Sequence, residues 1–312
     1  MIIVVSDVHL GYDKSDKDNF SNFIDSELTK LKANDHLVLL GDILDFWRKN
    51  CVDATVEHEK DSSIDDITPT EGGIMKKLFD LTKKTQVHYV VGNHDYSVLY
   101  FSKRVDNFPF PIFRNLHLSV QGTDKKFYFI HGYEFEVLAK FAFMTIEGYE
   151  KICQHLCDVR ETNVGRLESA IWSALHLFRF PIRKDGEHVP ATEYVPEQVV
   201  KSIKDEHRIT EPPEQRMKEL HPPSQDRMKP LLKPRDEIEE LAMSPVSRSM
   251  LIGGGPDETI IFGHTHSPFF TQDKMVANSG SWVTDNDFHD TYITIDNHGD
   301  VNLRQYIHND QH

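Results

Sequence analysis

Short runs of apolar residues, each followed by glycine or a polar side chain, recur along the first third of the chain. Three such runs are Ile2–Val5, Leu37–Leu40 and Val87–Val91. An uninterrupted apolar run of this length predicts a buried strand. A carboxylate that follows such a strand, as Asp42 does, costs free energy to bury unless it is paired. We therefore interpret Asp42 as a metal ligand whose partners come from other strand ends.

Segments with helical periodicity separate these strands. Apolar residues recur at steps of three and four over Phe20–Leu31, and a second helix is predicted around Met75–Leu81. A strand, a helix and a strand with short connections form a βαβ unit, in which the two strands are parallel. Ligands of open α/β sheets bind at the carboxyl ends of the strands. The polar residues that follow the strands are therefore expected at one edge of a sheet.

The second half of the predicted sheet structure has a different pattern. Leu116–Val120 and Phe127–Ile130 flank a turn at Gly122, which predicts a hairpin. Further strands are predicted at Thr259–Phe262, Lys274–Ala277, Thr291–Ile295 and Val301–Tyr306. The strands that end near residues 130 and 262 again deliver polar residues, so they are expected to contribute to the same edge.

A long insertion separates these strands. We expect a core formed by residues 1–132 and 258–312, and a helical and irregular insertion over residues 133–257. Apolar stripes over Phe135–Leu156 and Val164–Phe178 predict helices. Beyond residue 184 the insertion is charged and rich in proline, which favours irregular structure with one short helix near Asp236–Met243.

Composition narrows the classes of function. The 312 residues carry a net charge of −15, which disfavours a general nucleic-acid or anionic-membrane binder. Three cysteines cannot all pair, and Cys153 and Cys157, spaced four residues apart, predict packing on a helix face. The first apolar run is too short for a signal peptide, and no apolar run approaches the roughly 20 residues of a membrane span. We expect a cytoplasmic protein.

Five predicted strand-to-loop junctions carry imidazole, carboxylate or carboxamide groups. They contain Asp7 and His9; Asp42 and Asp45; Asn93, His94 and Asp95; His131; and His264 and His266. Nitrogen and oxygen ligands without sulfur suit manganese, iron or zinc. Seven of these ten side chains are candidate ligands. Seven ligands exceed the needs of one ion but fit two ions roughly 3.5–4 Å apart that share one carboxylate. Asp42, on the central strand, is the expected bridge.

These junctions resemble the five sequence blocks of the calcineurin-like metallophosphoesterases, in the same order. The blocks are Asp7-x-His9, Gly41-Asp42-x-x-Asp45, Gly92-Asn93-His94-Asp95, His131-Gly132 and Gly263-His264-Thr265-His266. The resemblance covers residues 1–132 and 258–312. It implies an α/β fold, a four-layer αββα sandwich with a helical lid insertion and the metals at the carboxyl edge of the strands.

The resemblance also implies a role for each residue. The first ion is expected on Asp7, His9 and His266, and the second on Asn93, His131 and His264, with Asp42 bridging. His94 is expected to contact the phosphoryl group or protonate the leaving oxygen, and Asp45 to orient His94. For Asp95, a structural cap and a functional role are both open. The implied enzyme hydrolyses a phosphodiester or pyrophosphate bond by attack of a metal-bridging hydroxide. Its cofactors are two divalent ions, with manganese first and iron or zinc as alternatives.

The substrate is open between several classes. Gly41–Trp47 resembles the corresponding stretch of UDP-2,3-diacylglucosamine pyrophosphohydrolases, which also insert a helical lid at this point. This resemblance implies a nucleotide-linked or lipid-like phosphorylated substrate. The apolar stripes of the insertion could face an acyl chain, or simply pack on the core. Those enzymes, however, usually have arginine where this chain has His94. Arg179 and Arg183 are candidates for phosphate binding, although arginines on helices commonly face solvent.

Three other classes fit the sequence less well. Asp7–Tyr12 resembles the opening of the nuclease subunit of the double-strand-break repair complex, which has a DNA-binding cap after its last metal block. In this chain only 46 residues, 267–312, follow the last block, and this segment is acidic on balance. A non-catalytic scaffold of the same fold would typically lack metal ligands or the catalytic histidine, and this chain has both. Protein serine/threonine phosphatases have arginine and glycine directly after the second aspartate of this block, where this chain has Phe46 and Trp47.

Overall fold

A computed structural model provides the fold of the chain. The residues that the structure describes are 1–47, 56–57, 68–69, 73–99, 110–141, 144–158, 237–271, 273, 275–285 and 288–307.

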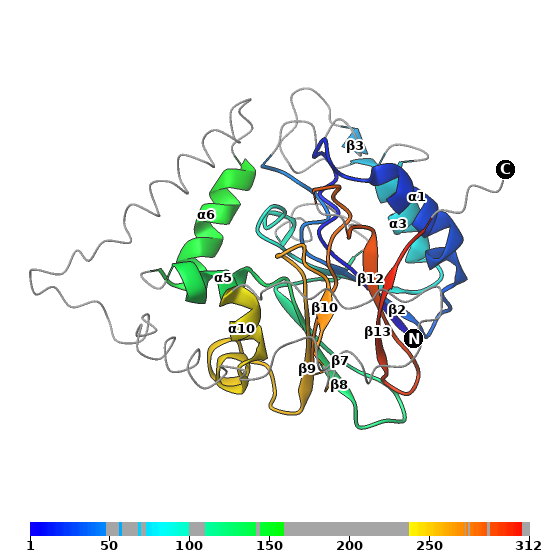
Figure 1. Ribbon diagram of the computed structural model, residues 1–312. Helices are drawn as coiled ribbons and strands as arrows, with labels where there is room; N and C mark the ends of the chain where they lie inside the picture. The colour runs from blue at the N-terminus through cyan, green and yellow to red at the C-terminus, as the bar shows by residue number, and fades with distance from the viewer. Residues whose placement is uncertain are drawn as a thin grey trace, which may run out of the picture.

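The first sheet has six strands and contains the predicted βαβ unit (Figure 1). Its order is β13 (Val301–Gln305), β12 (Thr291–Ile295), β1 (Ile2–Val5), β2 (His36–Leu40), β5 (Gln86–Val90) and β6 (Ile112–Phe113). Strands β1, β2, β5 and β6 are parallel to one another, whereas β12 and β13 are antiparallel to their neighbours. The parallel arrangement confirms the prediction and brings the carboxyl ends of β1, β2 and β5 to one edge.

The second sheet has five strands and contains the predicted hairpin. Its order is β10 (Phe269–Phe270), β11 (Val276–Asn278), β9 (Glu258–Phe262), β8 (Lys126–Ile130) and β7 (Asn115–Ser119). β7 and β8 are antiparallel, and β8 and β9 are parallel. Because β8 and β9 run in the same direction, His131 and Gly263 leave the sheet side by side, with the Gly263 N–H donating to the His131 carbonyl at 2.9 Å. A separate two-stranded sheet consists of β3 (Val56–Glu57) and β4 (Thr68–Pro69).

The described helices fall in the predicted segments, except for the π-helical turn η3, which was not predicted. They are α1 (Lys17–Ser26), the 3-10 turn η1 (Leu28–Lys30), α3 (Ile74–Leu81), α5 (Tyr133–Lys140), α6 (Ile146–Asp158), α10 (Glu237–Met243) and the π-helical turn η3 (Ser247–Leu251). The stripe over Phe135–Leu156 is two helices, because α5 ends at Lys140 and Thr145 starts a new helix by accepting the Gly148 N–H on its hydroxyl. The stripe over Val164–Phe178 lies outside the described residues.

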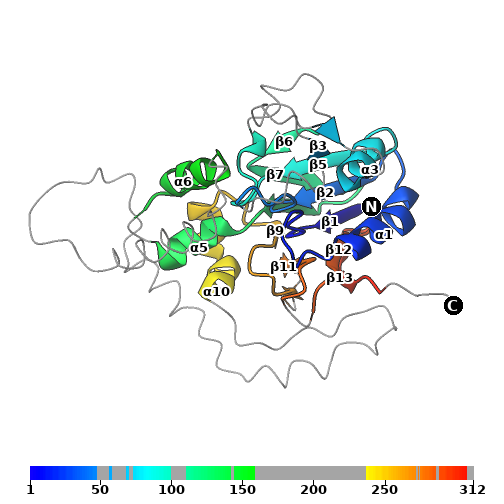
Figure 2. The ribbon, with the colours of Figure 1, turned by 90° about the horizontal axis from the view of Figure 1, so that it is seen from above.

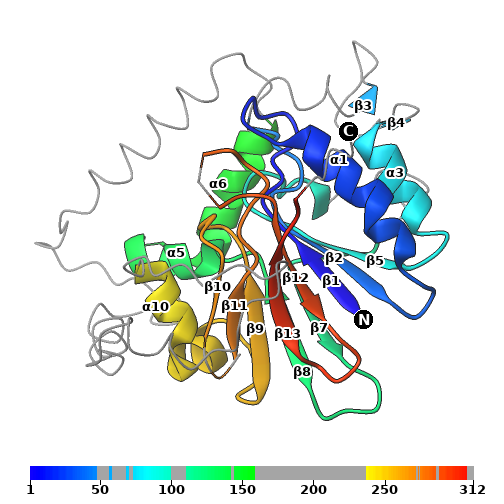
Figure 3. The same cartoon turned by 45° about the vertical axis from the view of Figure 1, so that its right-hand side comes forward.

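The elements form four layers (Figures 2 and 3). Alternate residues of β1 face opposite sides: Ile3 and Val5 pack with α1 and α3, whereas Ile2 and Val4 pack with residues of the second sheet. This alternation is the period of a strand buried on both faces. Helices therefore cover one face of the first sheet, the two sheets face each other, and helices cover the outer face of the second sheet. The predicted αββα sandwich is confirmed.

Helices from the region between the two halves of the sheet structure form the fourth layer. α5 and α10 cover the second sheet, where the ring of Phe135 meets that of Phe262 at 5.6 Å between centroids. α6 packs beside them with Tyr149 stacked on Tyr133. Cys153 and Cys157 of α6 are buried free thiols, which confirms their predicted packing role. Among the described residues, no helix is long and apolar enough to cross a membrane.

Candidate metal centre

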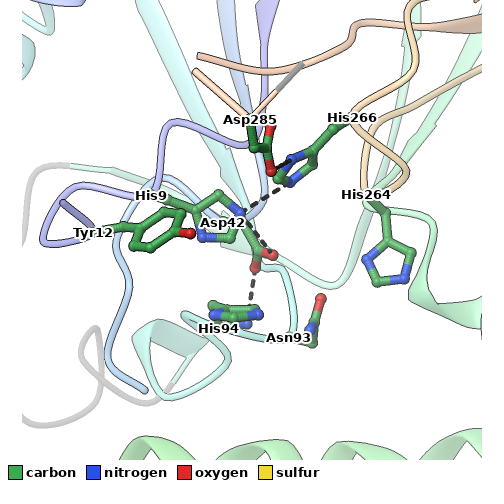
Figure 4. Close-up of a pocket in the computed structure, with 8 residues that line it drawn as sticks. All are labelled: His9, Tyr12, Asp42, Asn93, His94, His264, His266 and Asp285. Carbon is green, nitrogen blue, oxygen red and sulfur yellow. Dashed lines mark hydrogen bonds and ion pairs between the residues drawn. The ribbon is translucent and has the colours of Figure 1, made fainter. Parts of the chain in front are cut away.

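Residues that follow strands of both sheets meet at one pocket (Figure 4). Backbone hydrogen bonds hold the turns together: the Asp7 N–H donates to the Gly41 carbonyl at 3.0 Å, and the His9 N–H donates to the Asp42 carbonyl at 2.8 Å. The pocket is lined by His9, Tyr12, Asp42, Asn93, His94, His264, His266 and Asp285. Its volume of about 150 Å³ suits a phosphoryl group. It is below the volume typical of pockets that enclose a whole small organic molecule.

Five of the site residues have left-handed backbone conformations. The φ angles are positive at Asp7, His9, Asp42, His264 and His266, between 50° and 67°. Aspartate and histidine tolerate this region better than most residues, but it is uncommon for any non-glycine residue. Such conformations cluster at functional sites, where the surrounding structure holds them. Here the left-handed residues turn the chain sharply after β1, β2 and β9, so that each side chain enters the pocket.

Two glycines of the motifs allow the turns to approach each other. A Cβ atom on Gly92 would overlap the Asp42 carboxylate, and one on Gly263 would overlap the Asp7 carboxylate. Both carboxylates also accept backbone hydrogen bonds, from the His94 N–H to Asp42 at 2.8 Å and from the His264 N–H to Asp7 at 3.0 Å. The glycines are therefore needed so that the buried aspartates can lie against neighbouring turns.

Four imidazoles are each held at one ring nitrogen, away from the centre of the pocket. His9 Nδ1 lies 3.0 Å from Asp45 Oδ2, and His131 Nδ1 lies 3.1 Å from the Leu40 carbonyl. His264 Nε2 lies 2.9 Å from Glu136 Oε2, and His266 Nδ1 lies 3.3 Å from Asp285 Oδ2. An acceptor at one nitrogen fixes the tautomer and leaves the other nitrogen for a metal.

Carboxylate and imidazole ligand atoms gather in three overlapping groups at this edge, and within each group they lie within 4.8 Å of one another. Two groups share no residue: one consists of Asp7, His9 and His266, and the other of Asp42, His131 and His264. The third, formed by His9, Asp42 and His94, draws on both of them. His131 Nε2 is 3.1 Å from Asp42 Oδ2, and His9 Nε2 is 3.7 Å from the same oxygen. The Asp42 carboxylate thus faces an imidazole from each group.

Several buried atoms of the pocket fit a bound cation. Asp7 Oδ1 and Asn93 Oδ1 are buried and accept no hydrogen bond from the described residues, and the buried His131 Nε2 faces the Asp42 carboxylate. An unsatisfied buried polar atom costs about 1–3 kcal/mol. All three are atoms that can donate an electron pair to a metal, and mixed nitrogen and oxygen donors suit a divalent ion. The residues present therefore fit the metal centre that their sequence pattern predicts.

The electrostatics of the pocket favour positive charge. Burial lowers the pKa of His131, but the carboxylates of Asp42 and Asp7 outweigh it and raise the pKa to about 10. Burial raises the pKa of Asp42, but the charges of His131 and His94 bring it well below its usual value. The carboxylates are thus held ionised among imidazoles, and the pocket stabilises either protons or cations.

His94 lies beside the two groups and has supports of its own. Its Nδ1 is 3.0 Å from Asp45 Oδ1, and its ring stacks on Trp47 with 3.9 Å between centroids. The Cys157 thiol of α6 donates to the His94 carbonyl at 3.3 Å. Asp45 therefore contacts two imidazoles with its two oxygens, His94 and His9, which places it as an orienting carboxylate between them.

Asp95 has the contacts of a structural cap. Its carboxylate accepts hydrogen bonds from the Gly92 N–H at 2.6 Å, the Ile43 N–H at 2.8 Å and the Tyr89 hydroxyl at 2.6 Å. Burial, followed by the charge of Asp42, raises its pKa to about 6. The carboxylate joins the turns after β2 and β5.

The structure brings together nearly all of the residues that the sequence singled out. Asp7, His9, Asp42, Asp45, Asn93, His94, His131, His264 and His266 meet at this edge. Arg179 and Arg183 lie outside the described residues. Sequence reasoning missed Glu136, Asp285 and Tyr12. The first two are ordinary acidic residues on a helix and a loop, and only their contacts with His264 and His266 distinguish them; Tyr12 followed the first motif without a recognised role.

Comparisons with known proteins identify the family. No curated protein matches the chain. The crystal structure of a protein of unknown function from Aquifex aeolicus aligns at 22% identity over 42% of this chain and 60% of that chain, with a TM-score of 0.25. That similarity is too low to support an inference about function. A family model described as calcineurin-like phosphoesterase matches residues 1–268. The chain, with its Asp and His clusters at the strand ends, belongs to the calcineurin-like phosphoesterase family of metal-dependent phosphoesterases.

Proposed function

We propose that this protein hydrolyses a phosphodiester or pyrophosphate bond with the help of two divalent metal ions. The observation that carries the proposal is the pair of neighbouring ligand groups, Asp7 with His9 and His266, and Asp42 with His131 and His264. Asp42 lies 3.1 Å from an imidazole of one group and 3.7 Å from an imidazole of the other, which supports a bridging role.

The ligands divide between the two ions. Asp7, His9 and His266 would hold the first, and Asn93, His131 and His264 the second, with Asp42 shared. Bound ions of this kind polarise phosphoryl oxygens and lower the pKa of a coordinated water. The side chains supply the geometry: each imidazole is fixed at its outer nitrogen by an acceptor, so its inner nitrogen needs no reorientation on binding.

His94 supplies the proton for the leaving group. Asp45 accepts the hydrogen bond of its Nδ1, and Trp47 covers one face of the ring. An imidazolium held in this way can donate a proton from its other nitrogen to the leaving oxygen as the phosphorus–oxygen bond breaks. Asp45 is a positioning residue in this scheme, because its two oxygens hold His94 and His9 but lie outside the pocket lining.

The size of the pocket supports a substrate of which only the phosphoryl group is enclosed. At about 150 Å³ the pocket accepts a phosphoryl group, so a nucleotide or lipid portion would extend across the rim near Tyr12. The stretch Gly41–Trp47 supports a nucleotide-linked amphiphile as the first class to test. Manganese is the first metal to test.

The test combines metal analysis with a substrate panel. We expect the purified protein to bind two divalent ions per chain by plasma mass spectrometry, and to hydrolyse bis-p-nitrophenyl phosphate after addition of manganese. Cyclic nucleotides, UDP-linked glycolipids and single-stranded DNA then distinguish substrate classes. A protein that binds no metal, or that binds two ions and hydrolyses no phosphodiester or pyrophosphate of the panel, would overturn the proposal.

A further inference from the structure

Glu136 is an acidic residue outside the five motifs that contacts the pocket through His264. It lies on α5, and its Oε2 is 2.9 Å from His264 Nε2. Two further donors hold the carboxylate: the Lys140 ammonium at 3.3 Å from Oε1 and the Tyr149 hydroxyl at 3.4 Å from Oε2. The carboxylate is thus fixed by its own helix and by α6 while it faces an imidazole of the site.

The contact determines which nitrogen of His264 is available. A neutral imidazole carries one proton, and a carboxylate beside Nε2 stabilises the tautomer with that proton on Nε2. Nδ1 then presents its lone pair, and His264 shares a group with Asp42 and His131. Figure 4 shows the His264 ring at the side of the pocket, separate from His9 and His266.

The other imidazole of the same motif is held by a different carboxylate. His266 Nδ1 is 3.3 Å from Asp285 Oδ2, and His266 belongs to the group with Asp7 and His9. Asp285 lines the pocket and comes from the loop after β11, whereas Glu136 comes from a helix on the second sheet. The two histidines of one motif therefore depend on carboxylates from unrelated elements, one for each ligand group.

We propose that Glu136 is a positioning residue that selectively strengthens the second metal site, the one formed by Asn93, His131 and His264. The proposal rests on the proposed function, because it assumes that these residues bind a metal. Outer carboxylates of this kind raise the basicity of a ligating imidazole and hold its orientation. Glu136 also ties the second site to α5 and α6 through Lys140 and Tyr149. The position of these helices therefore sets the affinity for one ion and not for the other.

The primary test measures metal binding rather than turnover. Manganese titrations of wild type, Glu136→Ala and Glu136→Gln are followed by calorimetry and by the electron paramagnetic resonance of coupled manganese pairs. We expect two classes of site in wild type, and a 10–100-fold weaker affinity for one of them in Glu136→Ala. Glu136→Gln keeps an oxygen acceptor but loses the charge, so its effect should be smaller. At one equivalent of manganese per chain, the coupled signal should fall in both variants.

A second set of variants identifies which ion is affected. In a His266→Ala background the remaining tight site contains His264, and Glu136→Ala should weaken it. In a His264→Ala background Glu136 has no imidazole to orient, and Glu136→Ala should change nothing further. Asp285→Ala should show the reverse pattern. Glu147→Ala, an exposed glutamate of α6 paired with Lys151, serves as the matched control and should bind manganese like wild type.

The outcomes separate this proposal from the proposed function. Wild type that binds no manganese contradicts the proposed function itself. Wild type that binds two ions, together with a Glu136→Ala variant of unchanged affinity, overturns only the role of Glu136. Equal weakening of both ions also overturns it, because that result indicates a general structural defect. Thermal unfolding of the metal-free variants by circular dichroism provides the independent check of folding.

Discussion

Two clusters of aspartate and histidine in the described part of the chain have ligand atoms within 4.8 Å of one another, yet they differ in how they balance charge. The metal-centre cluster combines Asp7 and Asp42 with four imidazoles. The second, which we call the cap cluster, consists of Asp16, His289 and Asp290, also within 4.8 Å of one another. Asp16 caps α1, and the Asn19 side-chain amide donates to Asp16 at 3.1 Å and to Asp290 at 2.8 Å.

The protonation of the carboxylates shows the difference. In the metal-centre cluster, neighbouring imidazoles outweigh burial and bring the pKa of Asp42 well below its usual value. In the cap cluster, burial, reinforced by the charge of Asp16, raises the pKa of Asp290 to about 6 despite the hydrogen bond from Asn19. The metal-centre cluster holds Asp42 ionised and attracts cations, whereas the cap cluster contains a carboxylate with a raised pKa that accepts a hydrogen bond from an amide. Proximity of acidic residues and histidine alone therefore does not define a metal site.

The largest expected effect comes from a matched pair of substitutions, one in each cluster. Asp42→Asn removes the shared charge, and we expect loss of at least one ion and a fall in turnover on the order of 10³-fold. Asp16→Asn keeps a good helix cap, and its metal content and turnover should match wild type. Metal analysis and phosphodiester hydrolysis measure both. If Asp16→Asn lost an ion, the distinction between the clusters would be wrong.

A second prediction separates metal binding from chemistry within the metal-centre cluster. His94→Ala should keep both ions, because neither of the two ligand groups proposed to hold an ion contains this ring, and should lose turnover by about 10²–10⁴-fold. Parallel measurements of metal stoichiometry and the maximal rate test it. A substrate with a better leaving group, which needs less protonation, should be affected less. Loss of a metal ion from His94→Ala would show that His94 is a ligand.

A third prediction concerns the close approach of the turns. In Gly92→Ala the new Cβ would overlap the Asp42 carboxylate, so we expect weaker metal binding and a loss of stability of about 1–3 kcal/mol. Gly148→Ala lies on α6, where the nearest atom to the new Cβ is the Thr145 hydroxyl at 3.2 Å. Its metal affinity should equal that of wild type. Calorimetric titration and thermal unfolding compare the two variants, and equal metal affinities would contradict the steric argument.

The smallest expected effect is a pH dependence of stability from the cap cluster. The pKa of Asp290 is about 6 in the folded chain, above its usual value of 3.8, so the folded state binds the proton more tightly. This contribution to stability is complete below pH 4 and is lost as the pH rises through 6. Asparagine tolerates the left-handed backbone at this position, where φ is 58°. Asp290→Asn should therefore gain about 1–2 kcal/mol relative to wild type between pH 4.5 and 7.5, after allowance for solvent screening.

Urea unfolding at a series of pH values provides the measurement for Asp290→Asn. The quantity of interest is the difference in unfolding free energy between variant and wild type. Asp124→Asn, at an exposed position in the turn between β7 and β8, is the control and should show no such trend. A difference that is flat with pH would mean that Asp290 is ionised in the folded chain throughout this range.

Local sequence pattern predicted most of the fold. The runs Ile2–Val5, Leu37–Leu40 and Thr291–Ile295 are strands because apolar residues of this length bury both faces of a sheet. The two-residue strands β3, β4, β6 and β10 were not predicted, since their pairing with neighbouring strands, rather than their own pattern, makes them strands. The apolar stripe over Phe135–Leu156 predicts helix without a break, because the same periodicity is present on both sides of the break between α5 and α6.

The sequence by itself determined which chemical groups follow each strand, and the parallel order of those strands is what brings the groups to one edge. Only the tertiary structure separates Asp42, which faces imidazoles, from Asp95, which is enclosed by N–H and O–H donors. It alone reveals Glu136 and Asp285 as partners of His264 and His266. The physical reason is distance along the chain: strand-end residues are predicted from their neighbours in sequence, whereas these carboxylates act through contacts between elements that local pattern does not encode.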